Sequence, residues 1–492
     1  MADHTPQNAN RRRFLKLAGA AGVAGALPGT AAADPVADAL DTGTESLQEA
    51  LVVFEENDDT ALLENLDLSE GYYGFEVLPI AFTRLTGTEI ELVAGLPEVL
   101  RVAPNEELEF ENDDSRADNR SGDVQAGEGV GEYTGENVHA AVIDSGIDGA
   151  HADFSENLVA NWRWVGDPLE DPERTLWEDV GNVNSDDNGH GTHCSGSIGA
   201  DGTESDGEFR GMAPDVDLTA YATGLGLLIV KPIAAYDHML DRQRDGEVDI
   251  QIASNSFVAG PGEFDPHDPL AVAMWHAHEE GMLITFSAGN DGPENDTLGQ
   301  RKQAPYTLSV AATHADGSVA DFSSRGDVDG NHSREEAYAN MVELYSGTPE
   351  DEIDGPFALH RNGVGAKGVD VMSTVNPAHP LAALGDDDEI WYGLLSGTSM
   401  SNPTTAGCAA LFLDAYFENH GEFPDPLDTI NTLEASADPD ATEGLNDPAG
   451  EATYTIENMG AGYVDALAAV ERAERGQTAR FNQVRVADSE GE

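Results

Sequence analysis

Residues 396–403 contain a serine that could act as a nucleophile. Ser399 stands among small residues, and the chain then runs into an apolar stretch typical of a buried helix. Ser399 is therefore predicted at a helix N-terminus, where backbone N–H groups lack intrahelical partners and the helix dipole favours negative charge. Pro403 is expected in the first turn of that helix, where its missing N–H costs little. An oxyanion that forms beside Ser399 would meet these donors.

Two further segments supply a carboxylate and an imidazole. In residues 140–148 an apolar run ends in Asp-Ser-Gly, so Asp144 is predicted at the end of a buried strand. In residues 188–196, His190 is predicted to begin a helix of small residues whose glycines allow close packing. Alone, Asp144 could be a turn acid and His190 a solvated cap. Together with Ser399 they supply a carboxylate, a base and a nucleophile in the chain order Asp, His, Ser.

These three segments, in this order, resemble the signature segments of the subtilisin-like serine proteases, or subtilases. A fourth segment, residues 285–292, is similar to the family's oxyanion-asparagine segment and contains Asn290. The resemblance covers roughly residues 120–475 and implies polypeptide substrates. It also implies that the Asn290 amide and the Ser399 backbone N–H bind the oxyanion. The alternative for Asn290 is a turn asparagine, because its neighbours are good turn residues.

The resemblance also suggests where substrate would bind. Subtilases bind a peptide as an added strand along a Ser-x-Gly segment, which is a form of β-augmentation. The corresponding residues 253–260 contain two serines, Ser254 and Ser256, so the register stays open. If Ser256 is the match, Val258 replaces the usual glycine and would narrow the first specificity pocket. The sequence predicts no preferred substrate side chain.

A structural calcium ion is a further implication of the resemblance. Asp153, nine residues after Asp144, matches a family position that ligates calcium. Acid-rich loops offer further oxygen ligands of the kind that calcium prefers. A solvated acid is the alternative for Asp153. The chemistry itself is expected to need no metal and no cofactor.

The composition is strongly acidic. Of 492 residues, 93 are Asp or Glu and 24 are Lys or Arg, which gives a formal net charge of −69. Self-repulsion of this size disfavours a compact fold at low ionic strength, whereas molar salt shortens the Debye length to about 3 Å. The sequence therefore predicts adaptation to high salt and resembles the secreted, halolysin-like subtilases of halophilic archaea. An ordinary acidic secreted protein is the alternative. Nucleic acid is not expected as a partner, because the sequence has no basic patch.

Residues 1–33 have the pattern of an export signal. Arginines at 11–13 precede a short apolar stretch and an alanine-rich end, as in signal peptides. The paired arginines before Phe-Leu-Lys are similar to a twin-arginine signal. The apolar part is too short for a comfortable membrane span. The sequence therefore predicts a secreted protein without membrane association after export, and a basic disordered tail is the alternative.

Residues 34–120 are predicted to form an inhibitor-type propeptide and linker. An acidic linker over 34–50 precedes a compact α+β pattern. Two strands, a helix and an edge strand are expected, at 51–54, 74–78, 90–96 and 97–105. This pattern is similar to the propeptides of subtilases, which assist folding and inhibit the enzyme until removed. A small independent domain is the alternative. Residues 111–122 are predicted as an exposed linker, with cleavage between about 108 and 124.

Residues 121–475 are predicted as the peptidase domain and residues 476–492 as a C-terminal tail. Short apolar runs alternate with helical stretches, which predicts a three-layer α/β fold with a parallel sheet and helices on both faces. Catalytic groups in such folds lie at the carboxyl ends of strands. Asp144, Asn290 and the loop before Ser399 are expected there. Strands are expected at 216–222, 249–255, 282–287 and 308–313, and acidic surface insertions at 327–360 (with a short helix at 334–345) and 385–389.

The two cysteines do not make a disulfide framework. Cys194 is predicted one helical turn beyond His190 on the same face. Cys408 is predicted as a small buried residue in the helix after Ser399. Neither thiol is expected to take part in catalysis.

The sequence thus predicts a secreted, monomeric serine endopeptidase that its own propeptide inhibits until removal. Two other functions use the same fold. A non-catalytic protein-binding member would need a hidden defect, because all four catalytic residues are present. A serine carboxyl peptidase has Glu and Asp where His190 would stand, and the His-Gly-Thr-His segment argues against it.

Overall fold

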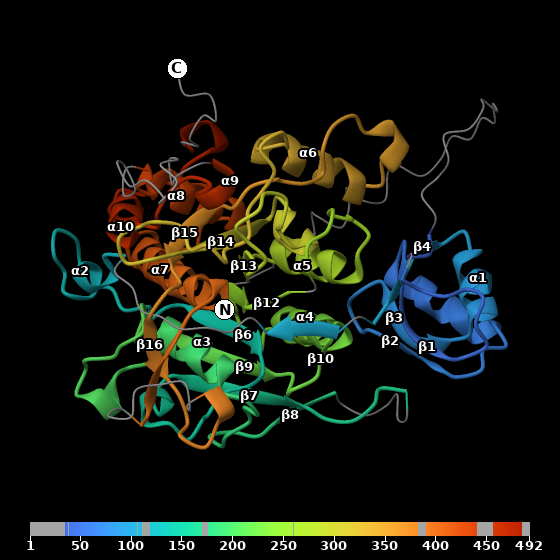
Figure 1. Ribbon diagram of the computed structural model, residues 1–492, viewed down its shortest axis with the longest axis horizontal. Coiled ribbons are helices and arrows are strands. Elements are labelled where there is room, and N and C mark those ends of the chain that lie inside the picture. The colour runs from blue at the N-terminus through green and yellow to red at the C-terminus, as the bar shows by residue number, and fades with distance from the viewer. Residues whose placement is uncertain are drawn as a thin grey trace, which may run out of the picture.

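The computed structural model describes residues 35–37, 39–105, 107–110, 119–169, 176–258, 260–381, 390–439 and 456–484. The predicted export signal at 1–33 and the acidic stretch 385–389 lie outside these residues. Figure 1 shows a small N-terminal unit in blue beside a larger unit that holds the rest of the chain. Across the described ranges, no helix is both long enough and apolar enough to span a bilayer.

The small unit is a four-stranded antiparallel sheet with α1 on one face. The strand order is β2-β3-β1-β4, so β4 is the predicted edge strand. The element bounds are β1 Gln48–Phe54, η3 Asn57–Asn65, β2 Tyr72–Gly74, β3 Ile80–Leu85, α1 Gly87–Ala94 and β4 Val99–Pro104. Helix α1 begins three residues earlier than predicted. Thr86 and Glu89 form a capping box there, a signal that the sequence itself carries.

One predicted strand of this unit is wrong. Residues 75–79 form a turn rather than a strand, and the strand that follows, β3, was not predicted. The reason lies in a distant contact, because the backbone N–H groups of Glu76, Val77 and Leu78 donate to Asp237 of the larger unit. The alternation of apolar residues in this stretch therefore reflects burial in a turn.

The predicted linkers are also more structured than expected. Within 34–50, Ala37 and Leu40 are buried, and the Ala37 N–H donates to the carbonyl of Val102. Within 111–122, Asn119 and Ser121 are buried, and α2 begins at Ser121. Two apolar anchors in a polar stretch, Ala37 and Leu40, explain the first difference. The second arises because Asn119 and Ser121 both contact Met212 Sδ, while residues 111–118 lie outside the described residues.

The larger unit is built on an eight-stranded sheet in the order β15-β14-β13-β11-β6-β9-β7-β8. All neighbouring strands run parallel except β7 and β8. The bounds are β6 His139–Asp144, β7 Leu158–Trp164, β8 Trp177–Asp179, β9 Asp217–Ala222, β11 Ile252–Asn255, β13 Leu283–Ser287, β14 Thr307–Thr313 and β15 Val364–Lys367. The four strands predicted in this unit are confirmed.

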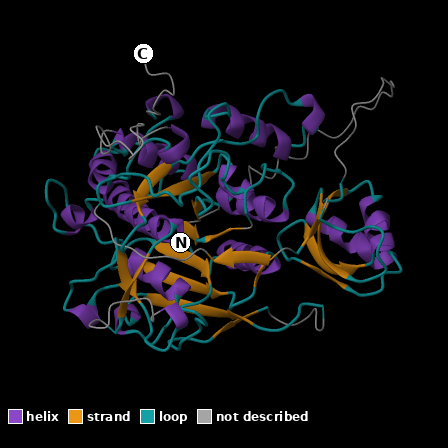
Figure 2. Ribbon diagram, in the orientation of Figure 1, coloured by secondary structure: helices purple, strands orange, loops and turns teal. Residues whose placement is uncertain are grey.

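The helices cover both faces of this sheet, as Figure 2 shows. They are α2 Ser121–Gln125, α3 His190–Gly199, α4 Val230–Arg244, α5 Pro269–Glu279, α6 Arg334–Tyr345, α7 Thr398–His420, α8 Pro426–Ser436, α9 Ile456–Met459 and α10 Ala466–Glu474. The short helix predicted at 334–345 is confirmed. Four short strands complete the unit, β10 Leu227–Leu228, β12 Phe257–Val258, β16 Val371–Thr374 and β17 Tyr392–Leu395.

Successive residues of β6 face opposite sides of the sheet, as the period of a strand requires. Ala140 and Val142 belong to an apolar cluster with α3, α7 and α10. Ala141 and Ile143 belong to a second cluster with α4 and α5. Burial on both faces confirms the predicted three-layer fold.

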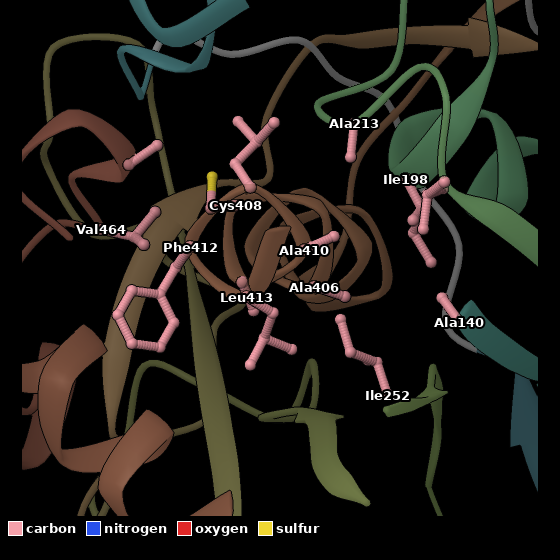
Figure 3. Packing of buried hydrophobic residues seen from close by; sticks show 14 of the residues in the cluster. Ala140, Ile198, Ala213, Ile252, Ala406, Cys408, Ala410, Phe412, Leu413 and Val464 are labelled. Atoms are coloured by element: carbon pink, nitrogen blue, oxygen red, sulfur yellow. The ribbon is translucent and has the colours of Figure 1, made fainter. Parts of the chain in front are cut away.

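Helix α7 lies at the centre of the first cluster (Figure 3). Its residues from Thr398 to Ala415 are all buried. Leu413 and Phe412 are among them, and burying a side chain of this kind contributes roughly 1.5–3 kcal/mol. The helix that carries Ser399 is therefore fixed firmly against the sheet.

Candidate active site

Asp144 and His190 form a buried pair at the carboxyl end of β6, an inner strand of the central sheet. Asp144 is the last residue of β6, and His190 is the first residue of α3. The His190 Nδ1 atom lies 2.7 Å from Asp144 Oδ1, and neither side chain is more than 1 % exposed. Gly191 permits this approach, because a Cβ atom there would lie 2.2 Å from the Gly146 carbonyl oxygen. The predicted placement of both residues is confirmed.

The electrostatics of the pair favour a basic imidazole. Burial lowers the pKa of His190, but the adjacent Asp144 carboxylate outweighs it, and the pKa lies well above its usual value. The neutral form, which can accept a proton, is therefore populated on the alkaline side of that raised pKa. The hydrogen bond from Nδ1 to the carboxylate leaves Nε2 as the atom that can act as base.

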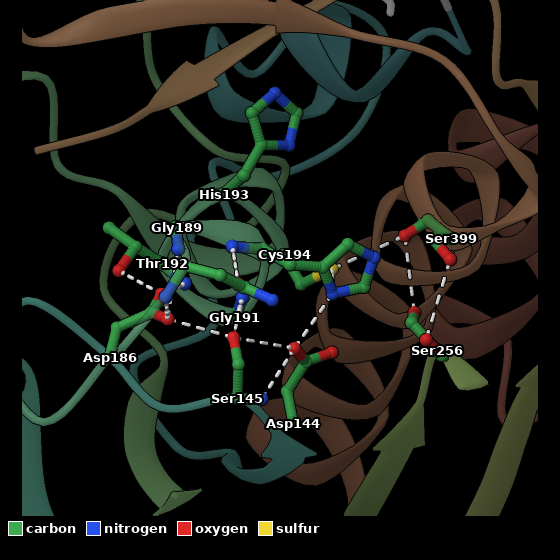
Figure 4. Close-up of polar contacts among 12 residues, drawn as sticks. Asp144, Ser145, Asp186, Gly189, Gly191, Thr192, His193, Cys194, Ser256 and Ser399 are labelled. Atoms are coloured by element: carbon green, nitrogen blue, oxygen red, sulfur yellow. Dashed lines mark hydrogen bonds and ion pairs between the residues drawn. The ribbon is translucent and has the colours of Figure 1, made fainter. Parts of the chain in front are cut away.

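A second carboxylate, Asp186, holds the helix that carries His190. Its Oδ1 accepts from Gly189 N at 3.0 Å and Ser145 Oγ at 2.8 Å, and its Oδ2 accepts from Thr192 N at 2.8 Å. Burial raises the pKa of Asp186, but the donors from Thr192, Gly189 and Asn188 lower it further than burial raises it. The Ser145 N–H in turn donates to Asp144 Oδ1 at 2.7 Å. Figure 4 shows this chain of contacts.

Asp186 and Ser145 were not predicted from the sequence. Asp186 stands just before the N-terminus of α3, where an acid is favoured by the helix dipole and by unpaired N–H groups. That position was the available signal.

Ser399 is the second residue of α7 and has no exposed surface. The N-cap residue Gly397 has φ +155°, a conformation that suits glycine. The Ser399 Oγ lies 3.4 Å from the Ser256 carbonyl oxygen. The predicted helix N-terminus is confirmed. The loop before Ser399 was expected at the carboxyl end of a strand of the central sheet. Instead it follows β17, which pairs with β16 in a separate two-stranded sheet.

The prediction for Pro403 is wrong, because this proline lies inside α7 and not in its first turn. Proline has no N–H, so the carbonyl four residues earlier, that of Ser399, lacks its usual helical donor. Ser256 Oγ donates to this carbonyl at 3.1 Å and Cys194 Sγ at 3.4 Å (Figure 4). Because of Pro403, the Ser399 carbonyl is left to accept hydrogen bonds from Ser256 and from Cys194 of α3.

Asn290 lies next to this helix N-terminus, three residues after β13. Its Oδ1 accepts from Thr398 N at 3.0 Å and from Thr398 Oγ at 3.1 Å. Thr398 directly precedes Ser399, and holding the amide oxygen fixes the orientation of the whole amide. The structure thus brings Asn290 together with the other three predicted residues.

The segment predicted to bind substrate follows the same helix. Ser254 is buried in β11, and its Oγ contacts Asn402 Nδ2 at 3.0 Å. Ser256 is the serine that contacts Ser399, which favours Ser256 for the register. The next residues form β12, which includes Val258. The structure describes the backbone of Val258 but not its side chain.

A strand of the N-terminal unit runs beside β12. β5, Glu107–Phe110, lies between β10 and β12 in a three-stranded sheet. Its register pairs Phe110 with Phe257, and Leu108 with Leu227, both antiparallel. An extended segment of the chain therefore lies between β10 and the strand that directly follows Ser256, the neighbour of the nucleophile.

The surroundings of Asp153 do not fit a calcium ion. Its Oδ1 accepts from Glu204 N at 2.8 Å, and its Oδ2 accepts from Tyr392 Oη at 2.8 Å. Asp153 is fully buried, and its two oxygens already bind protein donors. Asp153 therefore makes a structural contact with Tyr392 of β17.

Cys194 lies where it was predicted, one turn beyond His190. Its Sγ is 3.8 Å from His190 Nδ1, and Cys408 is buried elsewhere in α7. Possible ligand atoms of Cys194, His190 and Asp144 all lie within 4.8 Å of one another. Burial raises the pKa of the Cys194 thiol, which argues against a nucleophilic role.

A mercurial reagent is expected to inhibit the mature protein by more than about tenfold, because mercury on Cys194 would block His190. Cys194→Ser should resist inhibition and keep its activity, while Cys408→Ser should stay sensitive. Peptide hydrolysis before and after the reagent measures this. Resistance in Cys408→Ser alone would place the sensitive thiol in the other helix.

Comparison with known proteins agrees with this geometry. The subtilase family matches residues 135–450. Serine protease AprX of Bacillus subtilis (strain 168) is 28% identical over 295 residues, which cover 57% of this chain and 58% of that protein. A subtilisin of Bacillus sp. (strain TA39) is 29% identical over 292 residues, which cover 56% of each. The match thus spans a little over half the length of these relatives.

A solved structure shows the same fold over a larger part of the chain. Fervidolysin from Fervidobacterium pennivorans superposes with a TM-score of 0.58 at 20% identity, over 88% of this chain and 62% of that one. The family match covers more than half of the sequence and includes Asp144, His190 and Ser399. The chain therefore belongs to the subtilase family.

Proposed function

We propose that this protein is a serine endopeptidase that uses Asp144, His190 and Ser399. The observation that carries the proposal is the buried Asp144–His190 pair at the end of β6, beside a serine at the N-terminus of α7. His190 takes the proton of Ser399 Oγ as the oxygen attacks a peptide carbonyl, and then gives it to the leaving amine. Water repeats the sequence on the acyl-enzyme, and Asp144 stabilises the imidazolium at both stages.

The tetrahedral oxyanion binds to the Ser399 backbone N–H and to the Asn290 amide. The position of Ser399 in the first turn of α7 and the fixed orientation of Asn290 support this assignment. One donor of this kind is worth roughly 3–4 kcal/mol of transition-state stabilisation. Substrate adds as a strand beside β12, in the place where β5 pairs. In this register Ser256 stands opposite the residue that precedes the cleaved bond.

Clearing of casein in molar salt by the mature protein tests this function. A protein that folds and has lost its N-terminal unit but clears no casein would instead be the non-catalytic binding member of the fold.

The N-terminal unit acts as an inhibitory propeptide of the same chain. Its apolar face, with Leu51, Val53 and Phe82, joins the apolar cluster of α4 and α5. Arg101 of β4 adds an ion pair with Asp265 at 3.1 Å. Together with β5, these contacts support a unit that folds against the enzyme and leaves its end in the substrate site. The mature protease is proposed to be a monomer.

The chain is exported through its twin-arginine signal and works in strong salt. The acidic composition supports activity in strong salt, since the chain has 93 acidic and 24 basic residues. The motif in residues 11–16 supports export through the signal.

We expect the chain to cut itself between Glu111 and Asn112. Phe110 pairs with Phe257, and Ser256, which directly precedes Phe257, contacts Ser399. If the antiparallel register continued by one residue, Glu111 would stand opposite Ser256, and the bond that follows Glu111 is therefore the proposed cut. The N-terminal sequence of protein secreted from a host without other proteases measures the cut. Wild type should begin at Asn112, and Ser399→Ala should keep the earlier residues. If both begin at the same residue beyond 111, another protease makes the cut.

Asp237→Ala is expected to weaken inhibition by the separate 34–110 fragment at least about tenfold, because each hydrogen bond to a buried charge contributes roughly 1.5–3 kcal/mol. Asp237 Oδ1 accepts from Val77 N at 2.9 Å and Leu78 N at 3.2 Å, and Oδ2 accepts from Glu76 N. Inhibition constants for the mature enzyme measure the effect. Asp241→Ala, one turn along α4 and exposed, is the charge-matched control. Equal constants for both variants would contradict this docking contact.

A further inference from the structure

A small cavity lies beside β12, the strand along which substrate is proposed to bind. Phe257 of β12 and Phe286 of β13 form its apolar side, and their rings meet edge to face with centroids 5.0 Å apart. Residues 299–302 form another side, and Gly260 at the rim is partly exposed, so the cavity reaches the surface. Because Phe257 directly follows Ser256, this cavity is placed to receive the side chain that precedes the cleaved bond.

Lys302 brings a positive charge into the lining of this cavity. The residue is only 3 % exposed, and its Nζ atom lies 5.7 Å from the centroid of the Phe286 ring, which is a cation–π contact. The same atom lies near Gly289, since a Cβ atom built on that glycine would be 3.4 Å from it. Gly289 directly precedes Asn290, so the ammonium lies beside the segment that carries the proposed oxyanion amide.

The lining contains one further cation, Arg301, whose charge is already neutralised. Its Nε and Nη2 atoms lie 2.8 and 2.7 Å from the two carboxylate oxygens of Asp268. Among the described residues that line the cavity, none is acidic. A side chain that enters from the substrate strand therefore meets a positively charged lining, and Lys302 supplies that charge.

We propose that Lys302 makes the mature protease prefer an acidic side chain, above all glutamate, directly before the bond that it cuts. This inference rests on the proposed protease function and names the substrate class of that same site. A lysine ammonium has three donors, so it can bind a substrate carboxylate in addition to its contacts within the protein. A basic side chain is repelled there, and an apolar one covers the ammonium without offering an acceptor.

The proposed self-cleavage agrees with this preference. The register of β5 and β12, continued by one residue, brings Glu111 opposite Ser256, so a glutamate precedes the proposed cut. The free room in the cavity is about 10 Å3, which suits the tip of a polar side chain better than an aromatic ring. The chain thus carries, where it is to be cut, the kind of side chain that a lysine in this cavity would bind.

Two peptides that differ only in glutamate or glutamine before the cleaved bond test the preference. With the secreted wild-type protein in molar salt, kcat/KM should be at least about tenfold higher for the glutamate peptide, because a charge-assisted hydrogen bond is much stronger than a neutral one. Glutamine has the same size and shape, so the comparison isolates the charge. Equal values of kcat/KM for the two peptides would overturn the inference and leave the protease function standing.

Three variants, each matured by immobilised wild-type enzyme, assign the preference to Lys302. Lys302→Gln should make kcat/KM equal for the two peptides, whereas Lys302→Arg keeps the charge and should keep the preference. Arg475→Gln removes one positive charge from the exposed surface and should keep the wild-type ratio. A folded Lys302→Gln protein that still prefers glutamate would show that another residue binds the carboxylate, which would overturn the role of Lys302.

The outcomes also separate this inference from the proposed function. If the wild-type protein cuts neither peptide but a fluorophosphonate labels Ser399, the serine is active and the preference for acidic residues is wrong. If it cuts neither peptide and takes up no label, the protease function fails and the preference fails with it. The wild-type comparison needs no variant, so it decides even if Lys302→Gln does not fold.

Discussion

Replacing Ser399 with alanine is expected to lower peptide hydrolysis about a millionfold and to leave the fold intact. In subtilisin, loss of the serine or the histidine costs about 2 × 10⁶ in kcat, and what remains comes from binding and the oxyanion hole. The change removes one oxygen, which lies 3.4 Å from the Ser256 carbonyl oxygen. Because the variant cannot mature itself, immobilised wild-type enzyme should cut it first. Initial rates on a peptide substrate in molar salt then give the loss.

Two further variants make this prediction specific. His190→Ala should be about as damaging as Ser399→Ala, and the double variant no worse, because members of one catalytic unit are not additive. Ser195→Ala is the matched control, since Ser195 is buried in α3 close to His190 and has no hydrogen-bond partner in the described part of the chain. A wild-type rate in Ser399→Ala, or an inactive Ser195→Ala that is folded, would show that the nucleophile is misassigned.

Dialysis from molar to millimolar salt is expected to unfold the protein and abolish its activity. The formal net charge is −69, and repulsion between surface carboxylates grows as the Debye length rises from about 3 Å to about 30 Å. The few basic residues neutralise little of this surface charge, because some of them, Lys302, Arg301 and Arg334, are buried in the interior. Circular dichroism and hydrolysis, followed across one salt titration, measure both losses.

This salt effect arises from charge spread over the whole surface and not from one site. A constant circular dichroism signal from molar to millimolar salt would contradict the adaptation to high salt.

The sequence predicted the central sheet and the four candidate site residues because their signals are local. Strands buried on both faces appear as continuous apolar runs, as in β6 and β13. Asp144 and His190 stand at ends of elements, where small residues and a change of pattern mark the boundary. Ser399 follows the same rule at the start of α7.

The errors concern contacts between residues far apart in the sequence. The turn at 75–79 is held by Asp237, about 160 positions further on. Pro403 was placed by the usual preference of proline for a first turn, whereas Ser256 and Cys194 satisfy the carbonyl that it leaves without a donor. The position of Asp186 before α3 could have been read from the sequence, but its link through Ser145 to Asp144 forms only when β6 and α3 lie together.

Labelling with a fluorophosphonate probe tests the central claim most directly. The probe forms a covalent bond only with a serine that a neighbouring base has activated, and peptide mass spectrometry identifies the modified residue. Mature protein in molar salt should carry one label, on Ser399, and His190→Ala should carry none. A label on another serine, or an active protein that takes up no label, would contradict the assignment of Asp144, His190 and Ser399 as its catalytic residues.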